Sequence, residues 1–255
     1  MSIATYLFLA IASGFAGFID AIAGGGGLIQ LPALLIGLPQ KPIGLILGTN
    51  KVPAILGTSS SAIAYFRKVR PELHAVLFMA GPAMAGSALG AHLASHFPSH
   101  TFRPIIIALL IMVAIYTWKR PHLGVEENLR FSARGRNLLL ALIGLLIGFY
   151  DGIFGPGTGT FLVFSLVGII GYAFLKASAT AKLVNISTNF AALVTFQISG
   201  HIWWRLGLVM AAANITGSIL GARLAIRGGS TLVRKVFLFV VAILILKLGY
   251  DWLHQ

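Results

Sequence analysis

The chain has 255 residues, of which 57% are hydrophobic and 10% charged, with no cysteine and a formal net charge of +13. Because soluble domains carry roughly a quarter charged residues, this composition excludes a water-soluble globule and indicates a polytopic membrane protein. The apolar runs are continuous rather than alternating, which favours membrane helices over a β-barrel. The absence of cysteine excludes disulfides and thiolate metal sites.

The basic residues are scattered between hydrophobic segments and do not gather in one stretch. This pattern is typical of charge at the cytoplasmic membrane surface, so no nucleic-acid partner is expected. The apolar run from Ile3 to Ile19 has no basic residue before it, and the first positive side chain is Lys41. A cleaved signal peptide has a basic leading region, so none is expected here.

A membrane helix needs about twenty mostly apolar residues. In chain order, the apolar stretches predict helices at 3–22, 26–38, 43–66, 72–94, 102–119, 137–154, 157–171, 174–198, 203–226 and 232–250. The combined stretches 3–38 and 137–171 are too long for one straight crossing of a hydrocarbon core of about 30 Å. Glycines interrupt both, so each is predicted to be a pair of helices joined at a break.

The chain repeats itself. The stretch 17–26 returns 131 residues later as 148–157 with six of ten positions identical, and 86–94 returns as 217–225 with seven of nine. We therefore predict an all-helical membrane protein with two homologous repeats, each with a glycine-broken helix pair. The expected divisions are 1–120 for the first repeat, 121–136 for a basic cytoplasmic linker and 137–255 for the second repeat.

The basic loops bear on how the repeats are oriented. The first half's basic loop, 67–70, follows its 43–66 helix, whereas the second half's, 227–235, follows 203–226, one helix later in the repeat. Since basic loops remain in the cytoplasm, this offset favours inverted repeats and an external N-terminus. Parallel repeats stay an alternative, and they would place Arg227 outside.

The glycine breaks predict helices that begin inside the membrane. A helix N-terminus offers free N–H groups and partial positive charge, and glycine lets an anion approach the backbone. The alternative is close helix packing, which suits the isolated Gly86, Gly90, Gly217 and Gly221 better. The candidate substrate-binding residues at the breaks are Gly24, Gly25, Gly26, Gly27, Gly155, Gly157, Thr158 and Gly159.

Two repeated charge pairs lie inside the apolar segments. Asp20 and Asp151 precede the breaks, and Lys51 and Lys182 lie about eight residues into later helices. Ionisable groups at membrane depth are functional candidates, so the aspartates could carry protons or balance the lysines. The alternatives are that the aspartates accept hydrogen bonds at the break and that the lysines extend to the membrane surface.

Polar neighbours surround both lysines, and the candidate ligands among them are Thr49, Asn50, Thr180 and Asn185. Hydroxyl, amide and ammonium groups are all donors, which favours an anion with several oxygens as the substrate. The histidines show no metal-ligand pattern and have no acidic partners nearby in sequence. No metal or other cofactor is expected.

The Asp20 and Asp151 motifs with their glycines, together with the steps Thr49-Asn50-Lys51 and Ala179-Thr180-Ala181-Lys182, resemble the TauE/SafE sulfite exporter family. The resemblance covers essentially the whole chain. It implies a multi-pass protein of the bacterial inner membrane, with about eight spans in two halves, that transports sulfite, sulfoacetate or other organosulfonates. It supplies no family-wide catalytic residues.

The sequence therefore predicts a secondary transporter, not an enzyme, that moves a small sulfur-containing anion by alternating access, with proton coupling as an option. An anion channel and a transporter of another small organic anion are the alternatives. The lipid bilayer is an expected partner, and a homodimer formed through small-residue faces is an option.

Overall fold

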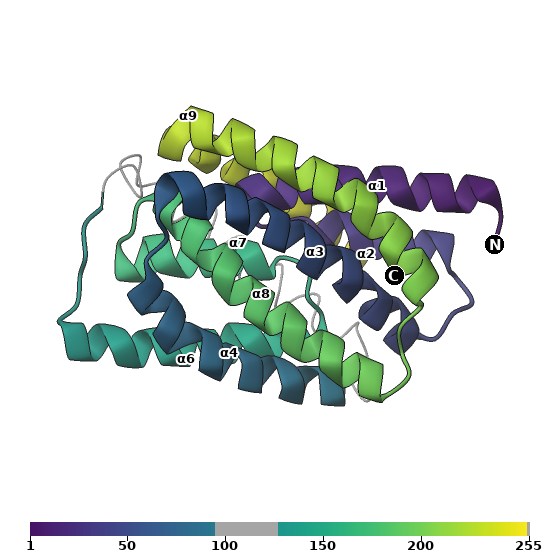
Figure 1. The fold of residues 1–255 in the computed structure, drawn as a ribbon, viewed down its shortest axis with the longest axis horizontal. Helices are drawn as coiled ribbons and strands as arrows, with labels where there is room; N and C mark the ends of the chain where they lie inside the picture. The colour runs from purple at the N-terminus through teal and green to yellow at the C-terminus, as the bar shows by residue number, and fades with distance from the viewer. Residues whose placement is uncertain (95–126, 254–255) are drawn as a thin grey trace.

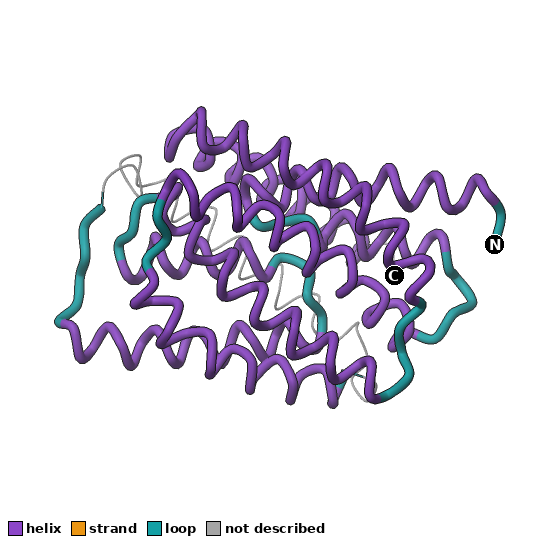
Figure 2. Tube along the Cα trace, viewed as in Figure 1, coloured by secondary structure: helices purple, strands orange, loops and turns teal. Residues whose placement is uncertain are grey.

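The computed structural model describes residues 1–94 and 127–253, and this part of the chain is helical (Figures 1 and 2). The helix predicted for 102–119 and the start of the predicted linker lie outside it. The elements are α1 (Ile3–Ala23), α2 (Gly27–Gly37), α3 (Ile43–Val69), α4 (Leu73–Leu93), α6 (Ala133–Ile153), α7 (Thr158–Phe164), η2 (Ser165–Ile170), α8 (Phe174–Ile198) and α9 (Trp204–Leu253).

The predicted helix boundaries agree closely with the observed ones in this part of the chain. Both long stretches are divided at their glycines, as predicted, into α1 with α2 and α6 with α7. The largest differences are at α6, which begins four residues before the predicted start, and at α3 and α9, which each end three residues after the predicted end. Helix α9 is interrupted at Gly229, where φ is 65°, within the predicted gap between 226 and 232.

The outside of the bundle is apolar and its centre is polar. Large hydrophobic side chains such as Ile3, Leu77 and Ile198 are 77–88% exposed. Four described helices are long and apolar enough to cross a membrane: α1, α4, α6 and the Trp204–Phe239 part of α9. Helices α3 and α8 are longer than α1 but bury polar residues, among them Lys51 and Lys182. This is the arrangement of a multi-pass membrane protein.

Two tightly packed helix pairs, α1 with α9 and α4 with α6, form opposite sides of the bundle (Figure 1). Glycines allow the close approach. A β-carbon on Gly86 would collide with the carbonyl oxygen of Leu145, and one on Gly217 with that of Gly14. The structure therefore confirms packing as the role of Gly86 and Gly217, as small residues allow in membrane helices.

The basic loops gather at one end of the bundle, on the left in Figure 1. Lys176 at the start of α8 forms ion pairs with Glu72 before α4 and Glu127 before α6, at 2.9 and 3.0 Å. The amide of Leu175 donates to Ser230 after the kink of α9. Lys176 also holds the pKa of the Glu72 carboxyl below its ordinary value. The N-terminus and the 38–42 and 199–203 connections lie at the other end.

Candidate functional site

The two glycine breaks meet at the centre of the bundle. Helix α1 ends at Gly24, whose φ of 79° is left-handed and whose amide donates to the carbonyl of Asp20 at 2.8 Å. Gly155 and Gly157, with φ of 82° and 84°, form the second break. The amide of Thr160 at the start of α7 donates to the Gly24 carbonyl at 3.1 Å. The breaks are therefore in direct backbone contact.

This contact requires glycine at two positions. A β-carbon on Gly159 would lie 2.6 Å from the Cα of Gly24, and one on Gly24 would overlap the Gly159 backbone. We expect Gly24→Ala and Gly159→Ala each to cost at least about 1–3 kcal/mol of stability, the usual cost of overpacking. Gly81→Ala is the matched control, because nothing lies within 4 Å of its β-carbon position. Thermal unfolding in detergent measures the difference, and equal midpoints for all three variants would contradict it.

The aspartates and lysines pair crosswise between the two halves of the chain. Lys51 Nζ lies 3.0 Å from Asp151 Oδ2 and donates to the Asp151 carbonyl at 2.9 Å. Lys182 Nζ lies 2.9 Å from Asp20 Oδ2 and also donates to the Asp20 carbonyl. Both lysine side chains are 3% exposed. Each aspartate therefore neutralises a buried lysine that lies on the other side of the linker.

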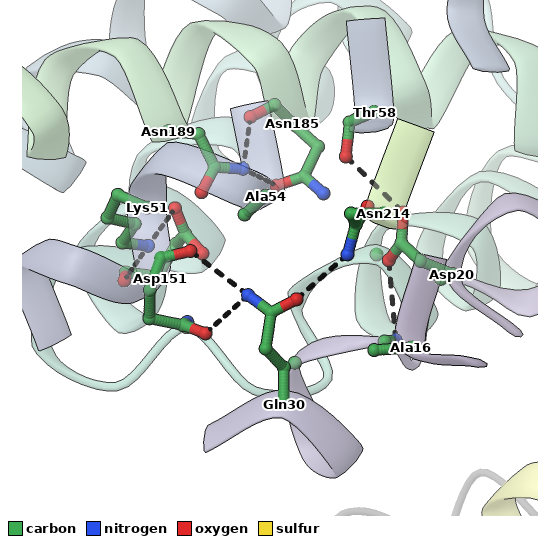
Figure 3. A pocket seen from close by; sticks show the side chains of 16 residues that line it. Ala16, Asp20, Gln30, Lys51, Ala54, Thr58, Asp151, Asn185, Asn189 and Asn214 are labelled. Atoms are coloured by element: carbon green, nitrogen blue, oxygen red, sulfur yellow. Dashed lines mark hydrogen bonds and ion pairs between the residues drawn. The ribbon is translucent and has the colours of Figure 1, made fainter. Parts of the chain in front are cut away.

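A pocket lies beside this crossing, with an empty volume of about 440 Å³ that includes space open to the outside. Figure 3 shows Lys51 and Asp151 on one side of it and Asp20 with Thr58 on the other. Asn185 and Asn189 of α8 lie above, and Gln30 of α2 lies below. The lining residues are Ala16, Asp20, Gly24, Gly26, Gly27, Gln30, Asn50, Lys51, Ala54, Thr58, Asp151, Gly155, Gly159, Asn185, Asn189 and Asn214.

The donors that face this pocket come mainly from side chains. Several backbone amides at the breaks are already bonded: Leu28 donates to Gly25, Ile29 to Gly26 and Thr160 to Gly24. Asn185 Oδ1 accepts from Asn189 at 2.8 Å, and its Nδ2 donates to no group within the described residues. With Lys51 at the same pocket, these groups can bind a small oxyanion.

Of the sixteen site residues predicted from the sequence, ten lie at the pocket wall in the structure and six do not. Those that line it are Asp20, Gly24, Gly26, Gly27, Asn50, Lys51, Asp151, Gly155, Gly159 and Asn185, and those that do not are Gly25, Thr49, Gly157, Thr158, Thr180 and Lys182. Two of the second group support the first. Thr158 Oγ1 donates to Asp151 Oδ1 at 2.8 Å, and Lys182 pairs with Asp20.

Thr49 and Thr180 lie inside α3 and α8, and each accepts a hydrogen bond from a backbone amide just before the start of another helix. Thr49 Oγ1 accepts from the amide of Trp203 just before α9, at 2.9 Å. Thr180 Oγ1 accepts from the amide of Glu72 just before α4, at 3.0 Å. Both hydroxyls satisfy otherwise free amides near helix N-termini. They hold α3 against α9 and α8 against α4.

Sequence reasoning missed four polar side chains that line the pocket: Gln30, Thr58, Asn189 and Asn214. Gln30 and Asn214 stand alone in apolar stretches, and neither position is polar in the other half of the chain. A polar residue inside a membrane helix is itself a signal. Gln30 and Asn214 could therefore have been predicted from their polar side chains in apolar stretches, without comparison of the two halves.

A helical bundle that is apolar outside and holds paired charges and amides around a central pocket is the architecture of a membrane transport protein. The profile of the family described as Sulfite exporter TauE/SafE matches residues 9–248, and the chain belongs to this family. It is a family of transporters and not of enzymes.

Individual relatives agree with this assignment. The chain is 38% identical to a "Probable membrane transporter protein ORF9" of Sinorhizobium sp. over 97% of this chain and 93% of the relative. It is 38% identical to a "Probable membrane transporter protein" of Haemophilus influenzae, over 94% and 93% of the two chains. It is 37% identical to the "Probable membrane transporter protein YfcA" of Escherichia coli K12, over 92% and 86%. No solved structure matches the chain.

Proposed function

We propose that this protein is a secondary transporter of a small sulfur-containing anion, such as sulfite, sulfoacetate or another organosulfonate, in the bacterial inner membrane. The anion binds in the central pocket, where Lys51 and the Asn50 and Asn185 amides donate to it. The observation that carries this proposal is a buried ammonium group, 3% exposed, at the wall of a polar pocket where the two breaks meet. Such a group favours anionic over cationic or neutral cargo.

The two halves act as inverted repeats that alternate access to this pocket. Two features of the described residues support the orientation. First, basic residues from both halves gather at the end that holds the 67–72, 127–136 and 171–176 segments, whereas the other end carries Lys41 and Arg205. Second, α1 and α6 start at opposite ends of the bundle. By the positive-inside rule, the basic end with the linker is cytoplasmic and the N-terminus is external.

Asp20 and Asp151 keep the lysines neutralised while the pocket is empty. When the anion binds, its negative charge replaces that of Asp151 beside Lys51. The released carboxylate keeps its hydrogen bond from Thr158 Oγ1. We assign any proton coupling of transport to Asp151, because it is the acidic group that the anion displaces from Lys51.

Transport by purified protein in liposomes tests the function. We expect saturable uptake of radiolabelled sulfite, and counterflow when the liposomes are preloaded with unlabelled anion. A channel would show neither counterflow nor saturable uptake. The absence of both would therefore indicate a channel instead of a transporter. A panel that includes sulfoacetate, sulfate and a carboxylate of similar size would identify the preferred anion.

The site is tested separately with a Lys51→Ala/Lys182→Ala double variant. Removing both buried ammonium groups should reduce anion uptake to the level of empty liposomes, because the pocket then presents two carboxylates and no positive charge. Lys68→Ala is the control, because this lysine is exposed at the end of α3. Normal uptake by a folded double variant would refute the assignment of the site.

A further inference from the structure

Gln30 is the centre of a buried hydrogen-bond network that joins four helices. Its Oε1 accepts from Ser13 of α1 at 2.9 Å and from Asn214 of α9 at 2.8 Å. Its Nε2 donates to the side-chain oxygen of Asn50 of α3 at 2.7 Å and to the Asn50 carbonyl at 3.2 Å. Both amide lone-pair sites and both N–H groups are used, so the orientation of Gln30 is fixed.

This network also fixes Asn50. Because Asn50 Oδ1 accepts from Gln30, its Nδ2 is directed away from that bond, and it donates to no group within the described residues. Asn50 lines the pocket and precedes Lys51, whose ammonium lies at the same wall. The Asn50 Nδ2 group is therefore an unused hydrogen-bond donor beside the Lys51 ammonium, and the two can bind oxygens of the same anion.

The positions related to this network by the 131-residue offset cannot form a second copy of it. The positions 131 residues from Ser13, Gln30, Asn50 and Asn214 are Gly144, Phe161, Ala181 and Ala83, none of which has a polar side chain. Phe161 packs edge-on against Tyr150, with ring centroids 5.4 Å apart. Lys51, which follows Asn50, does have a counterpart in the second half, Lys182. Lys182 does not line the pocket.

We propose that the transported anion binds at only one of the two repeated lysines. Lys51 contacts it together with the Asn50 and Asn185 amides, and Gln30 is a positioning residue that acts through Asn50. Lys182 supports the conformational change by its pair with Asp20 and does not touch the anion. This inference rests on the proposed function. The ligand it implies is a small oxyanion that offers one oxygen to an ammonium and a second to an amide.

Measurements of sulfite binding and of transport by single variants distinguish the residues that contact the anion from those that do not. We expect Asn50→Ala and Gln30→Leu each to raise the Kd for sulfite at least about tenfold, the effect of losing one charge-assisted hydrogen bond. If Gln30 acts through Asn50, the Gln30→Leu/Asn50→Ala double variant should bind no more weakly than Asn50→Ala alone. Lys182→Ala should lower the maximum transport rate and, because it leaves Asp20 unpaired at the pocket wall, raise the Kd by less than about tenfold, whereas Lys51→Ala should abolish binding.

Two results would overturn the inference while leaving the proposed function standing. One is that Lys51→Ala and Lys182→Ala weaken sulfite binding equally. The other is that the Gln30 and Asn50 effects multiply in the double variant, since a network that is merely structural gives independent losses. If the unmodified protein bound no anion of the panel, the proposed function would fail first, and the inference with it.

Discussion

Replacing Asp151 by alanine should lower the free energy of unfolding by about 3–5 kcal/mol, the cost of leaving a buried charge without its partner. The Asp151 and Lys51 side chains are 2% and 3% exposed. The substitution also removes one of the two acceptors of Thr158 Oγ1 and leaves the Gly155 carbonyl as the other. Thermal or denaturant unfolding of the purified protein in detergent measures the loss.

Two variants make this prediction specific. Glu127→Ala removes one partner of Lys176 at the surface, where the carboxylate side chain is 36% exposed. It should cost less than about 1 kcal/mol. Lys51→Met/Asp151→Leu replaces the whole buried pair with apolar groups, so it should regain most of the stability but bind no anion. Equal losses for Asp151→Ala and Glu127→Ala would show that the buried pair does not stabilise the fold.

The pocket should be reachable by charged solutes from the N-terminal side of the membrane and closed from the basic side. Gly27 and Gln30 of α2 line the pocket, and α2 runs from the break towards the N-terminal end (Figure 1). Towards the basic end, Ile147 and Phe161 pack against the apolar core. A charged reagent crosses a polar opening but is excluded by an apolar barrier.

The cysteine-free sequence makes this prediction measurable, because a single introduced cysteine is the only thiol. Ala54→Cys lies at the pocket wall and is partly exposed, and Ile147→Cys, equally partly exposed but outside the pocket wall, is the control. With a membrane-impermeant thiol reagent outside intact cells, Ala54→Cys should react at least about tenfold faster, which needs a barrier of only ~1.4 kcal/mol. Equal reaction, or reaction from the cytoplasmic side alone, would contradict the expected orientation and closure.

Helix positions were predictable because glycine breaks and apolar length act locally. The α1–α2 and α6–α7 divisions follow directly from the glycine clusters, and the interruption at Gly229 lies in the gap predicted between two apolar stretches. The repeat pointed to Asp20, Asp151, Lys51 and Lys182 as one set. It could not assign the partners, because the pairing of Lys51 with Asp151 depends on tertiary packing between residues 100 positions apart.

The sequence could not separate ligands from supporting residues. Thr49 and Thr180 lie among polar residues in the sequence, as ligands of a binding site would. In the structure, each instead accepts a hydrogen bond from a backbone amide, 154 and 108 residues away in the chain. Gln30 and Asn214 were not predicted, because the candidate residues were chosen mainly from positions that repeat. The equivalents of Gln30 and Asn214 in the other half are the apolar residues Phe161 and Ala83. The sequence shows that these positions differ between the halves, but only the structure shows that Gln30 and Asn214 bond to each other at the pocket.

The crosswise ion pairs have a consequence for the origin of the gene. A single unit with one aspartate and one lysine has no other unit to pair with, so both charges would stand alone in lipid. Two units in contact satisfy all four groups by mutual exchange. If the two halves arose by duplication of one unit, the pairs of Lys51 with Asp151 and of Lys182 with Asp20 could form only after two units had associated or been fused.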